Sequence, residues 1–218
     1  MAYTLVIGNK NYSSWSLRPW LALRVAGIPF DEVRIPLYVP GSKEQILRYS
    51  PAGKVPVLVA PDATVWESLA ILEFLADRHT EAKLWPAGSA QRARARAVST
   101  EMHGGFAALR SNLGMNLRRT FPDHATTPEV LADLARVQAL WNDCLARSGG
   151  PFLFGAFTNA DAMFAPVVTR FITYSVKVDA ASARYMAAVR ALPAMNEWYA
   201  AARQETEVLP QFERETAV

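Results

Sequence analysis

Three serines stand together near the start of the chain, where their hydroxyls are placed to stabilise an anion. Ser13, Ser14 and Ser16 follow an apolar segment, residues 4–7, that is typical of a buried strand. An apolar helical pattern begins directly after them. A strand-to-helix turn brings side-chain hydroxyls next to the unpaired N–H groups of the first helical turn. A turn of this kind can lower the pKa of a bound thiol, which is ordinarily about 8.5. The alternative is that all three serines only cap the helix and shape the turn.

A second informative segment is Ser50–Val59, which reads Ser-Pro-Ala-Gly-Lys-Val-Pro-Val-Leu-Val. Its first proline and its glycine predict a loop, and Val57–Val59 is a short buried strand. Val55 and Pro56 lie at the joint, where proline has no N–H to donate to a sheet. We expect a cis bond between them, which leaves the backbone N–H and C=O of Val55 open to an extended peptide ligand. Most bonds before proline are trans, so this expectation depends on the neighbouring motifs.

The acidic-serine pair Glu67-Ser68 lies at the next predicted strand-to-helix junction. Together with Val55-Pro56 and the serine turn, it resembles the cytosolic glutathione transferase family over essentially the whole chain. The resemblance implies that glutathione is the co-substrate. It implies that Val55 binds the cysteinyl backbone and that Glu67 and Ser68 bind the γ-glutamyl end. Lys54 suits the glycyl carboxylate, with a solvated loop lysine as the alternative. For Glu67 and Ser68, the alternative is that Ser68 only caps the helix and that Glu67 is a solvated edge residue.

Residues 13–18 read Ser-Ser-Trp-Ser-Leu-Arg, which is similar to the Ser-Ser-Cys-Ser-x-Arg motif of the zeta class. That class includes maleylacetoacetate isomerases, and here Trp15 stands in place of its cysteine. The distance from Ser14 to Arg18 also matches the theta-like Ser-x-x-x-Arg pattern. We therefore predict that Ser14 contacts the glutathione sulfur, that Ser13 is the next candidate, and that Ser16 caps the helix.

The resemblance implies a glutathione S-transferase that activates the thiol as a thiolate for attack on a small electrophile. One alternative is a glutathione-dependent cis-trans isomerase like maleylacetoacetate isomerase. Another is a non-enzymatic binding protein on the same fold, because a fold does not determine a function. Trp15 is expected to add an aromatic wall to the site of the second substrate. Further candidates for that site come from the later part of the chain: His103, Phe106, Arg110, Met115 and Arg170.

The order of predicted elements gives an α/β thioredoxin-like domain (βαβ-αββα) followed by an all-α helical domain. We expect the first domain at residues 1–80, a linker at 81–89 that contains a proline and a glycine, and the helical domain at 90–218. One long helix over 90–120 should bend at its glycines. A helix should begin at Thr127-Pro128, and Thr158 with Asp161 predicts a capping box. Two more helices are expected at 180–191 and 194–204.

Composition limits the other possibilities. The 23 basic and 20 acidic residues leave a net charge of only +3, without the clustered basic and aromatic side chains of nucleic-acid binders. No apolar run approaches the roughly 18 residues that cross a membrane, and no signal peptide is recognised. The single cysteine, Cys144, is typical of a reducing compartment, so we expect a cytoplasmic protein. The three histidines lack metal-ligand spacing, so no metal is expected. The family resemblance implies a homodimer.

Overall fold

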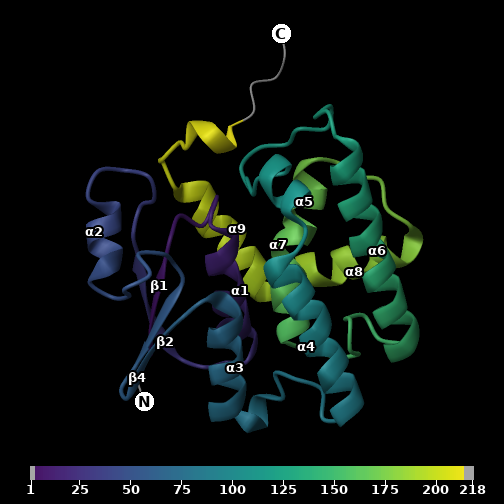
Figure 1. Ribbon diagram of the computed structural model, residues 1–218, viewed down its shortest axis with the longest axis horizontal. Coiled ribbons are helices and arrows are strands. Elements are labelled where there is room, and N and C mark those ends of the chain that lie inside the picture. Colours follow the sequence, from purple (N-terminus) through teal and green to yellow (C-terminus); the bar gives the residue numbers. More distant parts are fainter. Residues whose placement is uncertain (1–2, 214–218) are drawn as a thin grey trace.

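The computed structural model describes residues 3–213 as a small mixed sheet with its helices, followed by a helical half (Figure 1). The first half contains β1 (Tyr3–Ile7), α1 (Ser14–Val25), β2 (Phe30–Arg34), α2 (Ser42–Leu47), β3 (Val57–Ala60), β4 (Ala63–Trp66) and α3 (Ser68–Arg78). The second half contains α4 (Ser89–Gly104), α5 (Ala107–Asn112), α6 (Pro128–Ser148), α7 (Asn159–Thr173), α8 (Ala180–Arg190) and α9 (Pro193–Gln204). Two short 3-10 turns are η1 (Thr80–Ala82) and η2 (Pro210–Phe212). This order confirms the predicted fold class.

The four strands lie in the order β2-β1-β3-β4. Strands β1 and β2 are parallel, as a strand-helix-strand unit requires, with Tyr3 opposite Phe30. Strand β3 is antiparallel to β1, with Leu58 opposite Leu5, and forms a hairpin with β4. The apolar run of β1 is buried on both faces of the sheet, because α1 and α3 pack on one side and the segment around α2 covers the other.

Helix α7 is the centre of the helical half and joins it to the sheet half (Figure 1). It packs against α1, α4 and α8, and almost every one of its residues is buried. The predicted capping box is present at its start. Thr158 N–H donates to an Asp161 carboxylate oxygen at 2.8 Å, and the Leu153 N–H donates to the other oxygen at 3.0 Å. The same core cluster runs from the sheet into the helices, so the position of α7 is fixed against α1.

Two sequence expectations about helices are wrong, and so is the alternative that Ser68 caps α3. Helix α1 begins at Ser14 with Ser13 in the N-cap position, so Ser16 is not the cap. Helix α3 begins at Ser68, with Glu67 before it at a left-handed φ of 69°. The expected long helix over 90–120 is two helices instead, because the chain turns sharply after Gly104 through Phe106, whose φ is 56°. Several residue types cap a helix well, so neighbouring candidates cannot be ranked by type alone.

The helices at Pro128–Ser148, Ala180–Arg190 and Pro193–Gln204 match their predicted positions closely. Thr127 caps the first of them, with Pro128 in the first turn as expected. Within residues 3–213, no helix is both long enough and apolar enough to cross a membrane. After α9 the chain turns back over the sheet half and ends its described part beside the loop that follows α5 (Figure 1).

Candidate functional site

A cavity of about 680 Å³ opens between the sheet half and the helical half. Its walls come from the turn before α1, the loops around α2, the approach to β3, the start of α3, the segment around α5, α7 and the C-terminal segment. All the residues predicted to bind glutathione or activate its thiol line it: Ser13, Ser14, Lys54, Val55, Pro56, Glu67 and Ser68. The fold therefore places three motifs that are far apart in sequence around one space.

The serine turn separates the roles of its three hydroxyls. Ser13 Oγ lies 2.7 Å from Ser16 Oγ, and Ser16 Oγ accepts a hydrogen bond of 3.1 Å from the Gly8 N–H. Ser14 Oγ instead accepts a hydrogen bond of 3.0 Å from Arg170 Nη2. Among residues 3–213, no protein acceptor takes the proton of the Ser14 hydroxyl. Ser14 thus has a donor available to a ligand in the cavity, whereas Ser13 is engaged with Ser16.

The loop before β3 has the predicted form. The bond between Val55 and Pro56 is cis. Val55 is half-buried, and its N–H and C=O have no hydrogen-bond partner in the part of the chain that the structure describes. Lys54 is exposed at the rim of the cavity and forms no ion pair with another described residue. An extended ligand can therefore meet two free backbone groups and one ammonium group along this edge.

The acidic-serine pair lines the same cavity. Ser68 is buried, and its Oγ accepts a hydrogen bond of 3.3 Å from Arg18 Nη1. The half-exposed Glu67 carboxylate comes within 3.6 Å of His103 Nε2. Burial and the positive charge of Arg18 lower the pKa of His103, so this imidazole is neutral at pH 7. The N-terminus of α3 is also available to a negative charge here.

Three arginines gather at the cavity floor, which is formed by Trp15 and Ser14: Arg18 and Arg110 approach the Trp15 ring, and Arg170 binds Ser14. Arg18 and Arg170 are buried, and Arg110 lies with its guanidinium carbon 5.5 Å from the Trp15 ring centroid. Burial and the nearby arginines lower the pKa of Arg18, and burial lowers the pKa of Arg170 to about 10. Both remain cations at neutral pH. The cavity floor therefore favours an anion.

Five residues were expected to line the second-substrate side, and the structure supports three of them. Arg110, Met115 and Arg170 line the cavity. His103 and Phe106 do not. His103 packs its ring edge-on against Trp15 at 5.2 Å between centroids, and Phe106 is buried at the sharp turn before α5. Trp15 does line the cavity, as expected.

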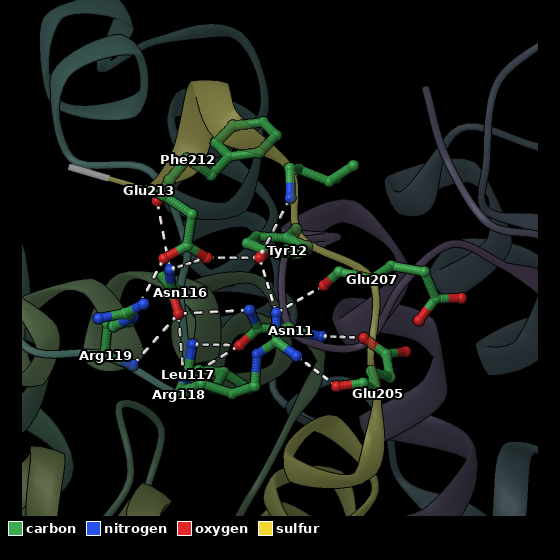
Figure 2. Close-up of polar contacts among 11 residues, drawn as sticks. Asn11, Tyr12, Asn116, Leu117, Arg118, Arg119, Glu205, Glu207, Phe212 and Glu213 are labelled. Atoms are coloured by element: carbon green, nitrogen blue, oxygen red, sulfur yellow. Dashed lines mark hydrogen bonds and ion pairs between the residues drawn. The ribbon is translucent and has the colours of Figure 1, made fainter. Parts of the chain in front are cut away.

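The C-terminal segment supplies a cavity wall that the sequence did not predict. Arg118 binds the backbone carbonyl oxygens of Glu205 and Glu207, and this fixes the start of the segment against the loop after α5 (Figure 2). Further along, Phe212 stacks on Tyr12 at 5.6 Å between ring centroids and lines the cavity. No motif marks Phe212 in the sequence. Tyr12 lies next to the serine turn, and this position is the one sequence signal that could have identified Tyr12 as a cavity residue.

The Glu205 carboxylate also ties the C-terminal segment to the turn before α1. It accepts hydrogen bonds from the N–H groups of Lys10 and Asn11, at 2.6 and 3.0 Å. Asn11 in turn accepts a hydrogen bond of 2.7 Å from the Leu117 N–H. The segment before the serine turn is thus tied both to the C-terminal segment and to the loop after α5 (Figure 2). No group of three or more metal-binding side chains occurs within residues 3–213.

Comparison with known proteins identifies two family models. The model described as the glutathione S-transferase N-terminal domain matches residues 12–78, and the one described as the glutathione S-transferase C-terminal domain matches residues 91–201. A curated relative, a probable maleylacetoacetate isomerase from Caenorhabditis elegans, is 32% identical over 100 residues. That match covers 46% of this chain and 46% of the relative, so it spans about half of the relative's length.

Solved structures share the whole fold. A glutathione transferase homologue from Burkholderia, determined with bound glutathione, has a TM-score of 0.72 at 20% identity. The superposition covers 93% of this chain and 98% of that one. Glutathione transferase Omega 2S from Trametes versicolor, in complex with 2,4-dihydroxybenzophenone, has a TM-score of 0.67 at 26% identity. Here the coverage is 93% and 95%.

Proposed function

We propose, because the chain belongs to the glutathione S-transferase family, that it binds glutathione in this cavity and activates the thiol for attack on a small electrophile. The observation that carries the proposal is the Ser14 hydroxyl. Its oxygen is held by Arg170, and no described residue takes its proton. A sulfur placed beside it therefore receives a hydrogen bond as well as the field of the α1 N-terminus.

The walls of the cavity match the groups of the tripeptide. The free N–H and C=O of Val55 pair with the cysteinyl backbone, and Pro56 fixes the end of that loop. Ser68 and the first N–H groups of α3 bind the γ-glutamyl carboxylate, and Glu67 binds the ammonium group. Lys54 binds the glycyl carboxylate at the rim. Each assignment uses a group that lines the cavity.

The chemistry needs only a thiolate. The thiol proton leaves to solvent, the sulfur forms a bond to the electrophilic carbon, and the leaving group departs with the bonding electron pair. Ser14 donates a hydrogen bond to the sulfur and needs no base, because it is not itself the nucleophile. At neutral pH a free thiol is only a few per cent ionised, so a lower thiol pKa raises the rate directly.

The test compares two neighbouring serines. Ser14→Ala should lower kcat/KM for a chloronitrobenzene by about tenfold or more, since each pH unit of thiol pKa changes the thiolate fraction about tenfold. Ser13→Ala is the matched control and should lose less, because its hydroxyl is engaged with Ser16. Retention of the protein on immobilised glutathione checks binding separately. Full turnover in the Ser14→Ala, Ser13→Ala double variant would contradict the role given to the turn.

A second candidate function is glutathione-dependent cis-trans isomerisation of maleylacetoacetate. The curated relative favours it, as does the Ser-Ser-x-Ser-x-Arg motif at residues 13–18. Trp15 stands where the zeta class has cysteine, so the second substrate meets an indole ring there. An isomerase assay on maleylacetoacetate, run beside the chloronitrobenzene assay on the same preparation, separates the two reactions.

The same proposal includes a homodimer that acts in the cytoplasm. Its support is the family, in which the sheet half of one subunit faces the helical half of the other. Light scattering on the purified chain measures the assembly, and a mass of one subunit at assay concentration would contradict it.

A further inference from the structure

We infer that Arg170 is a positioning residue for Ser14: it occupies an acceptor site of the Ser14 oxygen so that the hydroxyl proton is directed to the glutathione sulfur. The inference rests on the proposed function and extends it to α7, in the other half of the molecule. It concerns a contact between residues that are 156 positions apart.

The guanidinium of Arg170 is held in one orientation by the backbone. Its Nε donates to the Leu113 carbonyl oxygen at 2.7 Å, and its Nη1 donates to the Pro166 carbonyl oxygen at 3.4 Å. These two bonds fix the plane of the group, and the remaining nitrogen, Nη2, meets Ser14 Oγ at 3.0 Å. The side chain is 4% exposed, so it cannot swing into solvent and release the serine.

A hydroxyl has one proton to donate and two lone pairs that accept. Because Arg170 is a donor only, it forces Ser14 Oγ to act as the acceptor in this contact. The Ser14 proton must then point elsewhere, and the cavity is the open direction. A hydroxyl that accepts from a cation is also a stronger donor, because linked hydrogen bonds polarise one another. Ser13 differs, since its contact with Ser16 lets either oxygen be the donor.

The surrounding charges act in the same direction. The charged or titratable groups around Arg170 and the serine turn are Arg18 on α1, His103 on α4, Arg110 on α5, Glu67 just before α3 and Tyr174 just after α7. Glu67 is the one carboxylate among them and is half-exposed. With His103 neutral, the balance near the sulfur is positive at pH 7. Arg170 is thus a buried cation one hydroxyl away from the position where the thiolate forms, and it stabilises that anion.

The test measures the pKa of enzyme-bound glutathione from the thiolate absorbance near 240 nm. Arg170→Gln should raise this pKa by about one pH unit and lower kcat at pH 6.5 about tenfold. The loss in kcat should shrink toward pH 9, because the thiol is then deprotonated in the variant as well. The Kd for glutathione should change by less than about threefold, because Arg170 acts through Ser14. Arg170→Lys keeps the charge and should recover part of the shift.

The matched control is Thr173→Val on the same helix. Thr173 Oγ1 donates to the Asn116 carbonyl oxygen at 2.8 Å, so it ties α7 to the same loop as Arg170 does but does not touch Ser14. It should leave the pKa of the bound thiol unchanged. Circular dichroism of each variant confirms that it is folded. In the Ser14→Ala background, Arg170→Gln should add little, since coupled residues are not additive.

Two results would overturn the inference. One is an unchanged thiol pKa in both folded Arg170 variants while Ser14→Ala raises it, which leaves the role of Ser14 intact. The other is an equal rise in Thr173→Val, which shows that any loosening of α7 has this effect. If Ser14→Ala leaves the pKa of the bound thiol unchanged, that result would instead contradict the proposed function.

Discussion

The ring centroid of Trp15 lies 4.1 Å from the guanidinium carbon of Arg18, three residues further along α1. Arg110 approaches the same ring at 5.5 Å. One indole therefore faces two cations, of which Arg18 is 1% exposed. The electron-rich face of an indole attracts a cation, most strongly where water is excluded. Trp15 thus compensates part of the repulsion among the arginines at the cavity floor.

This contact predicts that Trp15→Ala lowers the free energy of unfolding by about 2–4 kcal/mol, from lost packing and from the lost cation–ring attraction. Trp15→Phe keeps a ring at the same position and should cost clearly less. Urea unfolding at pH 7 measures both variants. A loss in Trp15→Ala of less than about 0.5 kcal/mol would show that the indole is not needed there.

The role of Ser16 as an internal acceptor is testable in the same way. Ser16→Ala leaves the buried Gly8 N–H without its acceptor, which should cost about 1–3 kcal/mol of stability. Ser99→Ala is the matched control, because the Ser99 hydroxyl is equally buried and has no hydrogen-bond partner among the described residues. It should cost little. Equal losses in the two variants would mean that the bond to Gly8 contributes nothing.

Asp161 makes the stability depend on pH. Burial raises the pKa of its carboxyl to about 6, against an ordinary value of 3.8. Between these values the folded protein holds more protons than the unfolded chain, so this group's contribution to stability falls as pH rises. Asp161→Asn removes the titration. The free energy of unfolding of the wild type minus that of Asp161→Asn should therefore be larger at pH 4.5 than at pH 7.5, by about 2 kcal/mol.

Urea titrations of both proteins at the two pH values check this. The sign is the decisive point. A carboxylate stabilised by its hydrogen bonds more than it is destabilised by burial would give the reverse, with the larger difference at pH 7.5. Thr158→Ala is a second test of the Asp161 carboxylate, because it removes one hydrogen-bond donor and keeps the titrating group.

The Tyr12 hydroxyl makes three hydrogen bonds, two of them to the C-terminal segment and one to the loop after α5. It donates to Glu213 at 2.5 Å and accepts from Arg118 at 2.8 Å and from the Leu209 N–H at 3.3 Å. Tyr12→Phe should therefore loosen residues 205–213 and speed hydrogen exchange at the Leu209 amide, about tenfold for each 1.4 kcal/mol lost. Tyr38→Phe is the control. Tyr38 also approaches the Phe212 ring, but it is 70% exposed and its hydroxyl binds no described residue.

The cavity residues named from the sequence are those that lie in short local motifs. Val55-Pro56 and Glu67-Ser68 each lie within one short segment, so a family resemblance carried by those motifs could name them, and both pairs line the cavity. Arg170 was named as a cavity residue, but its bond to Ser14 joins two halves of the chain that no local pattern connects. Phe212 lies in a segment with neither an apolar period nor a motif. Its place depends on what Arg118 and Tyr12 bind, which only the folded chain shows.

The return of the chain after α9 has a consequence for synthesis. Strands β1–β4 and helices α1–α3 are made first, and they already contain Ser14, Val55 and Ser68. Arg170 and Phe212 leave the ribosome much later, after most of the chain has been translated. A nascent chain halted before residue 212 therefore carries the free backbone edge at Val55 but lacks a wall of the pocket. The cavity is therefore completed only after α7 and the C-terminal segment have been made, although most of its lining residues come from the first half.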